Sequence, residues 1–398
     1  MRRISIALGV MVATALVGQS VVPAQAMAST DGSAPLSLAE PTGPYRVGRT
    51  TLHLKDPGRA DPWVPAKRRE LMVSVWYPTW LPRGRTAAYT SRKESELLVR
   101  HFNAGLPPGT GLPLDLLATV ETHAKADAPP LPGRGALALV VLSPGWELPR
   151  SSQSGLAEDL ASRGYVVAAI DHTYESVAVE FPDGRVTGCV ACARLAALPE
   201  DQHERFFEKV TAGRAADVSF VLDRLTGSRP AWRGGRSIDP RRIAMAGHSI
   251  GGASALPAML ADARVKAGIN MDGRQSPALT VPFDRPFMLL GGEQSVPGGD
   301  IGWDPTWDRL TGWKRWLSVR GMGHESFSDL AVLLGQLGAP LPGLPGDRCV
   351  RIVTGYVAGF LDLHLRKIPQ PLLDGPSARF PEVDFHSGPG PGTAPNAG

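Results

Sequence analysis

The sequence predicts an α/β fold built on a mostly parallel central sheet with helices on both faces. Two continuous apolar runs, Ala136–Leu142 and Tyr165–Ile170, are typical of strands that are buried on both sides. A helical segment, Leu156–Arg163, lies between them and ends at a glycine. From residue 136 onward such runs and helices alternate regularly, and this alternation indicates parallel strands connected by helices.

The remaining elements follow from the same patterns. The expected strands are Arg69–Tyr77, Ala136–Leu142, Tyr165–Ile170, Arg242–Ala246, Val265–Met271, Phe287–Leu290 and Trp316–Val319. The expected helices are Ser91–Phe102, Leu114–His123, Leu156–Arg163, Glu200–Leu225, Gly251–Leu260 and Arg348–Leu365. The Asp183-Gly184 pair predicts a hairpin turn within Phe181–Val186, and Pro257 predicts a kink in its helix.

Length and composition fit a single large domain. The chain has 398 residues, of which 43% are hydrophobic and 20% are charged. Its formal net charge of +4 includes Arg2 and Arg3, which lie in a segment that we expect to be removed. The mature surface is then near neutral, so no nucleic-acid partner is predicted. We expect the folded domain to span 41–374, between a flexible segment 27–40 and a disordered tail 375–398.

Residues 1–26 have the composition of a secretory signal peptide. Two arginines precede an apolar stretch over 4–17, and Ala24-Gln25-Ala26 is a small-x-small cleavage site. The alternative is an uncleaved anchor helix, but glycine and polar residues near 18–20 weaken a full membrane span. The sequence therefore predicts a secreted protein.

Three cysteines are present, Cys189, Cys192 and Cys349. An oxidising destination favours one disulfide and one remaining thiol. Cys189 and Cys192 could pair with each other, or either could pair with Cys349, and the sequence leaves the pairing open. The cluster offers too few ligands for a zinc site, so no metal or other cofactor is predicted.

The strongest local motif is Gly247-His248-Ser249-Ile250-Gly251. It lies between an expected strand and an expected helix, which is the context in which G-x-S-x-G forms a nucleophile elbow. Residues two positions either side of the serine pack against each other in such a turn, so glycine is needed there. We therefore predict that Ser249 is a nucleophile and that His248 points sideways as a packing residue.

A serine nucleophile needs a general base and an acid that orients the base. In folds with a nucleophile elbow the chain order is serine, then the acid, then the histidine. Three histidines follow Ser249, namely His324, His364 and His386. His364 falls in the closing helix and His386 in the tail, whereas His324 follows a strand in a glycine-rich loop. Such a loop can bring an imidazole over the strand ends, so His324 is the predicted base.

Two carboxylates compete for the role of the acid. Asp272 ends one expected strand, and Glu293 follows the next strand along the chain. Asp300 and Asp304 lie farther into a loop and are weaker candidates. The residue pattern alone leaves Asp272 and Glu293 level.

Two backbone N–H groups are expected to face a developing oxyanion. One belongs to Ile250, the residue after the nucleophile. The other belongs to Trp146, which follows the turn Ser143-Pro144-Gly145 at the end of a predicted strand. Glycine at position 145 allows the backbone to turn toward the site.

Several segments resemble the type II (plasma and intracellular) platelet-activating factor acetylhydrolase family of α/β-hydrolases and its bacterial relatives. They are LVVLSPGW (139–146), DLASRGYVVAAIDH (159–172), GHSIGGAS (247–254), VKAGINMDG (265–273) and KRWLSVRGMGHESFSDL (314–330). The resemblance implies an α/β-hydrolase fold that hydrolyses esters with short or oxidised acyl groups without a metal ion.

The resemblance also implies roles for single residues. Ser249, Asp272 and His324 match the triad of the family, and Trp146 and Ile250 match its oxyanion amides. Because the family carries its acid after the strand that follows the nucleophile helix, the match favours Asp272 over Glu293. Pro144 is a departure, since the animal enzymes have a histidine at that position.

The segment from Gly291 to Trp313 is predicted to pass beside the mouth of the site. Its glycine and proline content suits an irregular loop, and it carries Trp303 and Trp307. These indoles could simply anchor the loop to the domain. Aromatic walls also suit an apolar acyl or aryl group, so we expect Trp303 or Trp307 to line the acyl site.

Together these features predict a secreted serine esterase that cleaves short-acyl esters, or short sn-2 acyl groups of phospholipids, through an acyl-enzyme. One alternative is a broader lipase or cutinase-like polyester hydrolase that uses Glu293 as its acid. Another is a non-catalytic binding protein of the same fold, which the complete set of triad residues disfavours. The expected partner is a small ester or lipid substrate, with transient contact to a lipid surface, and a monomer is assumed.

Overall fold

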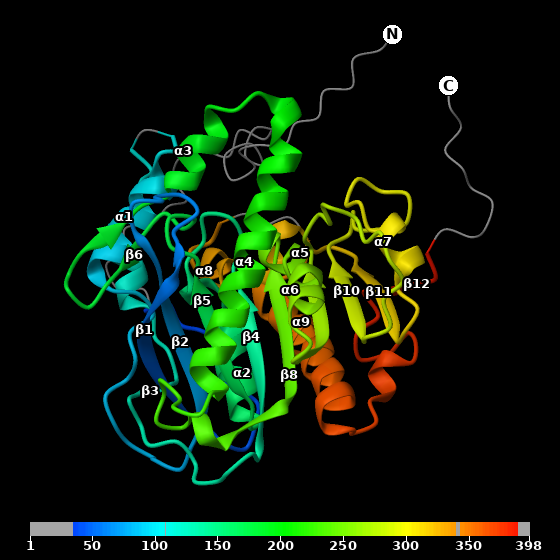
Figure 1. The fold of residues 1–398 in the computed structure, drawn as a ribbon, viewed down its shortest axis with the longest axis horizontal. Coiled ribbons are helices and arrows are strands. Elements are labelled where there is room, and N and C mark those ends of the chain that lie inside the picture. The colour runs from blue at the N-terminus through cyan, green and yellow to red at the C-terminus, as the bar shows by residue number, and fades with distance from the viewer. Residues whose placement is uncertain (1–34, 108, 340–342, 389–398) are drawn as a thin grey trace.

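A twisted ten-stranded sheet forms the centre of the computed structural model, which describes residues 35–107, 109–339 and 343–388. Within these ranges the strand order is β12-β11-β10-β9-β8-β4-β5-β2-β1-β3 (Figure 1). The strands are β1 (Arg46–Ala60), β2 (Arg68–Thr79), β3 (Lys125–Ala126), β4 (Leu137–Ser143), β5 (Val166–Asp171), β8 (Ile238–His248), β9 (Val265–Met271), β10 (Phe287–Gly291), β11 (Lys314–Val319) and β12 (Val383–His386). A separate hairpin pairs β6 (Val179–Glu180) with β7 (Val186–Thr187).

The middle of the sheet is parallel, as the sequence predicts. Strands β5, β4, β8, β9, β10 and β11 pair in parallel. At one edge β2 pairs antiparallel with both β5 and β1, and at the other edge β12 pairs antiparallel with β11. Because parallel strands end at the same edge, the loops after β4, β8, β9 and β11 meet above the carboxyl ends of the strands.

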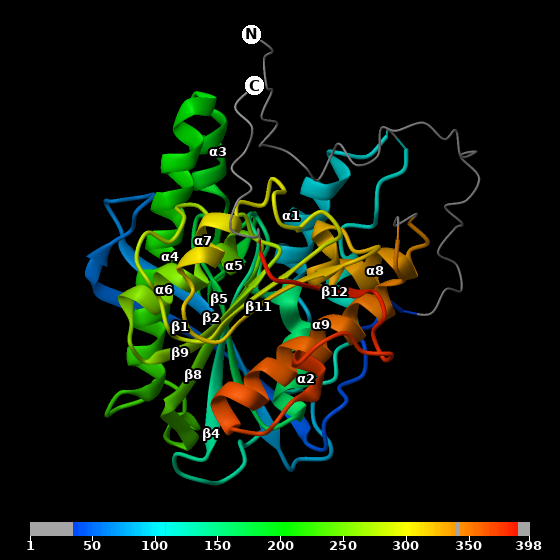
Figure 2. The same ribbon diagram turned by 90° about the vertical axis from the view of Figure 1, so that its right-hand side faces the viewer.

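Both faces of the sheet are covered by helices. In β4, Val140 and Leu142 pack in a cluster with α2 (Ser154–Ser162) and α9 (Gly346–Leu361). The alternate residues Leu139 and Val141 pack in a second cluster with α4 (His203–Thr226) and α6 (Ala255–Ala261). Figure 2 shows these two helix layers on opposite sides of the strands. The continuous apolar run is explained by this double burial, because successive side chains of a strand point to opposite faces.

Five further α-helices complete the described part of the chain. They are α1 (Arg92–Asn103), α3 (Val190–Ala196), α5 (Ile250–Ala253), α7 (Asp304–Arg309) and α8 (Leu330–Gln336). Figure 1 shows α3 and the first turns of α4 rising beyond the carboxyl ends of the strands. Of the helices in the described ranges, none combines the length and apolar character that a membrane span requires.

Two expected helices differ from the structure. The segment Leu114–His123 contains only a short 3-10 turn over Leu116–Thr119, although its apolar residues are partly buried. The helix after Ser249 is broken into α5 and α6 at Ser254, whose hydroxyl donates to the carbonyl of Ile250 at 2.6 Å. Since α6 starts anew, Pro257 falls in its first turn, where N–H groups have no partner within the helix.

Two segments that were expected to lie outside the domain are part of it. The prediction of a disordered tail is wrong for 375–388, because β12 pairs with β11 and His386 bonds Ser318 Oγ at 2.7 Å. The prediction of a flexible segment is wrong for 35–40, where Leu36 and Leu38 are buried. Short segments of this kind show little hydrophobic periodicity in the sequence, and contacts with distant parts of the chain hold them in place. The signal segment 1–26 and residues 27–34 and 389–398 lie outside the described ranges.

The disulfide joins Cys189 and Cys192, with their Cα atoms 5.3 Å apart. It closes the start of α3, so the pairing that the sequence left open is the local one. Cys349 is a free thiol buried in α9.

Candidate active site

Ser249 lies in a sharp turn between β8 and α5, with φ 57° and ψ −128°. L-residues rarely adopt this conformation, and such strain is typical of functional turns. A Cβ at Gly247 would lie 2.3 Å from the carbonyl carbon of Gly251. A Cβ at Gly251 would lie 2.0 Å from the carbonyl oxygen of Ser143. The elbow therefore needs both glycines, and it packs directly against the end of β4.

His324 reaches the serine from the loop after β11. Its Nε2 lies 2.9 Å from Ser249 Oγ, and its Nδ1 lies 2.7 Å from Oδ2 of Asp272. The other carboxylate oxygen of Asp272 accepts hydrogen bonds from the Gly292 N–H at 2.8 Å and the Ser295 hydroxyl at 2.6 Å. The structure thus brings the three predicted residues into one hydrogen-bonded chain.

The charges of His324 and Asp272 depend on each other. Burial opposes protonation of His324, but the hydrogen bond to Asp272, together with the charges of Asp272 and Glu325, outweighs burial and raises the pKa of the imidazole. Burial also opposes ionisation of Asp272, but the hydrogen bond and charge of His324 lower the pKa of the carboxyl. An ionised carboxylate in this position stabilises the imidazolium that forms when the histidine accepts a proton.

Glu293 makes a different contact. Its carboxylate accepts a hydrogen bond from the Gly321 N–H at 2.8 Å, and its own N–H donates to the carbonyl of Met322 at 2.9 Å. These bonds hold the loop that leads to His324. Among the described residues the imidazole pairs with Asp272, so geometry separates the two carboxylates that the residue pattern left level.

His248 is buried, as predicted, and it also makes a specific contact. Its Nε2 lies 2.9 Å from the carbonyl oxygen of His324, and its ring stacks on Phe327. Burial, followed by the nearby charge of His324, lowers the pKa of His248 to about 3. The neutral ring can donate to a carbonyl only through a protonated Nε2, so this bond fixes its tautomer and holds the backbone of the histidine loop.

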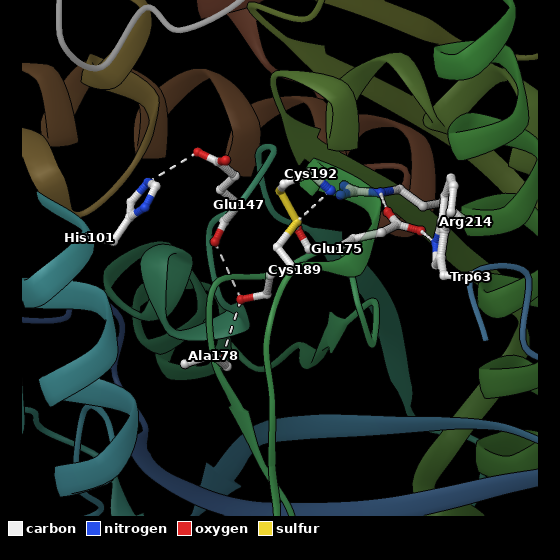
Figure 3. Close-up of a disulfide and its surroundings, with 9 residues drawn as sticks. Trp63, His101, Glu147, Glu175, Ala178, Cys189, Cys192 and Arg214 are labelled. Atoms are coloured by element: carbon white, nitrogen blue, oxygen red, sulfur yellow. Dashed lines mark hydrogen bonds and ion pairs between the residues drawn. A yellow bond between two sulfur atoms is a disulfide. The ribbon is translucent and has the colours of Figure 1, made fainter. Parts of the chain in front are cut away.

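The loop Ser143–Glu147 carries the predicted oxyanion amide and lies against the elbow. A Cβ at Gly145 would lie 3.1 Å from Nδ1 of His248, so the two turns are in close contact. Among the described residues, the N–H groups of Trp146 and Ile250 have no hydrogen-bond partner. Glu147 adopts φ 67° and pairs with His101 of α1 at 3.2 Å (Figure 3).

An aromatic cluster covers the same loop. The Trp146 ring is half-buried and meets Phe206 and Phe207 edge-on, with ring centroids 5.9 and 5.6 Å apart. Ile250 packs against this cluster as well. Apolar surface therefore lies beside both predicted oxyanion amides, and it comes from α4 rather than from the loop 291–313.

The prediction that Trp303 or Trp307 lines the acyl site is wrong. Trp303 is 0% exposed and donates through Nε1 to the carbonyl of Gly273 at 2.7 Å. Trp307 is 8% exposed and donates to the carbonyl of Ser387 at 2.9 Å. Both rings meet Trp316 of β11 edge-on. An irregular loop gains order by burying its large side chains, and here the indoles anchor the loop to the sheet.

A second Ser–His–Asp chain begins at Ser143, the first residue of the loop Ser143–Glu147, and sequence reasoning missed it. His172 Nε2 lies 3.0 Å from Ser143 Oγ, and its Nδ1 lies 2.9 Å from Oδ2 of Asp217. All three side chains are buried. Asp217 also accepts hydrogen bonds from Arg69, and Arg214 donates to Ser143 Oγ at 3.2 Å. The available signal was the placement of Arg214 and Asp217 among the apolar residues of the buried stripe of α4.

The described residues hold no group of three or more His, Cys, Asp or Glu side chains arranged to bind a metal ion. The site offers a serine hydroxyl, an imidazole and a carboxylate, and the nearby N–H groups of Trp146 and Ile250 have no partner within the described ranges.

Comparisons with known proteins agree with this arrangement. A ferulic acid esterase from Streptomyces cinnamoneus has a similar structure, with a TM-score of 0.75 and 42% sequence identity over 88% of this chain and 99% of that one. A probable 1-alkyl-2-acetylglycerophosphocholine esterase of Arthroderma benhamiae is 28% identical over 91% of this chain and 96% of its own length. A platelet-activating factor acetylhydrolase of the dog is 26% identical over 52% of both chains.

The fold and these relatives define a carboxylic-ester hydrolase with the α/β-hydrolase fold. The family model for platelet-activating factor acetylhydrolase, isoform II, matches residues 38–183 and 233–347, which together exceed half of the chain. The chain therefore belongs to the platelet-activating factor acetylhydrolase isoform II family, as the sequence segments predict.

Proposed function

We propose that the protein is a secreted serine esterase in which Ser249 is the nucleophile, His324 the general base and Asp272 the orienting acid. The observation that carries the proposal is the continuous hydrogen-bonded chain from Ser249 Oγ through His324 to Asp272. It stands at the carboxyl ends of parallel strands, where sites of open α/β sheets form.

The proposed reaction passes through an acyl-enzyme. Ser249 Oγ attacks the ester carbonyl carbon while its proton moves to Nε2 of His324. The carbonyl oxygen becomes an oxyanion that accepts hydrogen bonds from the N–H groups of Trp146 and Ile250. The oxyanion collapses, and His324 returns the proton to the leaving alcohol oxygen. Water then attacks the acyl carbon while His324 accepts a proton from it. The bond between the acyl carbon and Ser249 Oγ breaks, His324 returns the proton to Ser249 Oγ, and the acid product leaves.

The first substrate class that we propose is esters with short acyl groups, including phospholipids with a short sn-2 acyl group. Membership of the family and similarity to the fungal protein named as a 1-alkyl-2-acetylglycerophosphocholine esterase support this class. A transient contact with a lipid surface belongs to the same proposal.

A second candidate class is esters of aromatic acids. The rings of Trp146, Phe206 and Phe207 lie together beside the predicted oxyanion amides, and aromatic walls suit a planar aryl acyl group. The 42% identity to a protein titled ferulic acid esterase supports the same class. A lipase or cutinase-like activity has less support, because the carboxylate that it was expected to use, Glu293, bonds the loop backbone instead of His324.

A substrate series separates these classes. We would measure kcat/KM for p-nitrophenyl acetate, butyrate and octanoate, methyl ferulate, a phospholipid with an sn-2 acetyl group, and a triglyceride. Highest values for the acetyl esters support the first class, and highest values for methyl ferulate support the second. Preference for octanoate and the triglyceride would contradict both. Turnover must vanish in Ser249→Ala, and persistence would refute the serine mechanism or the binding of substrate at this site.

Secretion is a separate part of the proposal. It rests on the basic start, the apolar stretch and the small-x-small site within residues 1–26. Expression of the full chain in a bacterial host, followed by N-terminal sequencing of protein from the medium, should give a mature end after Ala26. Intact protein retained in the membrane fraction would favour the uncleaved anchor.

A further inference from the structure

The direction of the Trp146 amide is set by its neighbours along the chain. Its N–H belongs to the peptide unit that joins Gly145 to Trp146. The preceding peptide unit presents the carbonyl of Pro144, which accepts a hydrogen bond from Arg214 at 2.6 Å. The following unit presents the N–H of Glu147, which donates to the carbonyl of Glu175 at 3.2 Å. The units on both sides of the predicted oxyanion donor are therefore tied to the domain.

The two residues that make these ties are also bonded to each other. Arg214 Nε donates to the Glu175 carboxylate at 2.8 Å, and Trp63 Nε1 donates to its other oxygen at 2.9 Å (Figure 3). Arg214, Glu175 and Trp63 are each 1% exposed. A charge-assisted bond without competing water holds a narrow geometry, so the guanidinium has little freedom to move away from Pro144.

The same helix also fixes the side chain of Trp146. Arg214 lies in α4, and so do Phe206 and Phe207, whose rings meet the indole edge-on. One helix thus contacts both the backbone of the loop, at Pro144, and the ring of the residue that carries the amide.

We propose that the buried pair Arg214–Glu175 positions the Trp146 N–H toward the place where the oxyanion forms above Ser249. This inference rests on the proposed serine-esterase function, and it adds two positioning residues that do not touch the substrate. Arginine suits the role because its planar fork donates to a carboxylate and a carbonyl at once, whereas lysine offers a single point of charge.

A donor that is misplaced by about 1 Å can lower the rate by about 100-fold, because the oxyanion exists only in the transition state. Before the attack, the uncharged carbonyl oxygen of the bound substrate gains less from this hydrogen bond than the oxyanion does later. The expected signature is therefore a loss in kcat with little change in KM, together with weaker binding of an inhibitor that forms an oxyanion.

Two variants test the inference. The first is Arg214→Lys. The second carries both Arg214→Met and Glu175→Gln, so that neither member of the pair is left as an unpaired buried charge. With p-nitrophenyl acetate, kcat should fall about 10- to 100-fold in both, while KM stays within about twofold. The inhibition constant of a trifluoromethyl ketone, which forms a tetrahedral adduct with the serine, should rise by the same factor as kcat falls. Glu175→Gln alone, which keeps the volume and the Trp63 bond, gives the same comparison if the arginine variants do not fold.

Arg285→Met is the matched control. Arg285 also donates to backbone carbonyls, including that of Val265 at 2.8 Å, but it precedes β10 at the opposite end of the strands from Ser249. Its kcat and inhibition constant should match the wild type. The inference is overturned if the folded Arg214 and Glu175 variants keep kcat and the inhibition constant within twofold, or if only KM changes. Turnover that survives in Ser249→Ala would instead overturn the proposed function.

Discussion

Two Ser–His–Asp chains of almost equal geometry occur in this molecule. In the first, His324 lies 2.9 Å from Ser249 and 2.7 Å from Asp272. In the second, His172 lies 3.0 Å from Ser143 and 2.9 Å from Asp217. Hydrogen-bond distances alone therefore cannot tell a catalytic arrangement from a structural one.

The surroundings of the two chains differ in three respects. The side chain of His324 is 46% exposed, whereas that of His172 is 1% exposed. Ser249 stands on a strained turn near the N–H groups of Trp146 and Ile250, which have no hydrogen-bond partner in the described part of the chain. Ser143 instead ends a regular strand and accepts a hydrogen bond from Arg214.

The third respect is charge. Hydrogen bonding to Asp272 raises the pKa of His324 against the effect of burial. Burial, reinforced by the charge of Arg214, lowers the pKa of His172. Asp217 also pairs with Arg69, so it stabilises a protonated His172 less than an unshared carboxylate would. Exposure, nearby N–H groups and a histidine with a raised pKa are the three features that favour the chain at Ser249 as the proposed active site.

The two serines should give the largest contrast. Ser249→Ala should lower kcat by about 10⁶, because the residual rate comes only from binding and the oxyanion amides. Ser143→Ala should keep kcat within about 10-fold, since its hydroxyl only joins buried groups. Steady-state hydrolysis of p-nitrophenyl acetate checks both, after contaminating esterase has been removed. A loss of about 10⁶ in Ser143→Ala would reverse the assignment.

The carboxylates near the site come next. Asp272→Asn should lower kcat by about 10⁴, because the amide no longer holds the imidazole in the right tautomer or stabilises the imidazolium. Glu293→Gln should have a small effect, since it bonds only the loop backbone at Gly321. Measuring kcat of both variants under the same conditions shows which carboxylate supports His324. The opposite ranking would support the cutinase-like alternative.

The acid of the buried chain should affect stability instead. Asp217→Asn weakens the pairing of the fully buried Arg69, so it should cost about 3–5 kcal/mol in the free energy of unfolding. Urea denaturation followed by circular dichroism measures this cost. The fraction that stays folded should keep kcat within about 10-fold. Unchanged stability with a large loss of kcat would mean that Asp217 acts in catalysis.

The smallest expected effect is on pH dependence. His324 must be neutral to accept a proton, and its pKa is raised, so kcat/KM should fall below a pH that lies above the ordinary histidine value of about 6.5. Asp272→Asn removes the main cause, and the acid limb of its residual activity should move to lower pH. His248 faces the same ring, but its pKa of about 3 keeps it neutral throughout this range. An acid limb that Asp272→Asn leaves in place would assign the titration to another group.

Parts of this comparison could be predicted from the sequence. Ser249 and His324 are marked locally, by paired glycines around a strand–helix turn and by a glycine-rich loop after a strand. Asp272 and Glu293 could not be separated by pattern, because both follow strands that end at the same edge. The positions of the neighbouring loops decide which carboxylate meets the imidazole, and the sequence does not reveal those positions. The preference for Asp272 therefore came from the family resemblance.

Other parts depend on contacts between distant segments. Ser143, His172 and Asp217 come from β4, the loop after β5 and α4, so no local spacing connects them. Trp303 and Trp307 were expected to line a pocket because their loop lacks periodicity. Their burial against Trp316 follows from packing on the sheet, which loop composition does not reveal.

Covalent labelling distinguishes Ser249 from Ser143 without any substitution in the chain. A fluorophosphonate reacts with a serine that is both accessible and activated by a base, and peptide mapping by mass spectrometry then identifies the labelled residue. We expect modification of Ser249, in step with loss of activity, and no modification of Ser143. Inactivation with the label on Ser143 or on any serine other than Ser249, or a folded and active protein that takes up no label, would contradict this expectation.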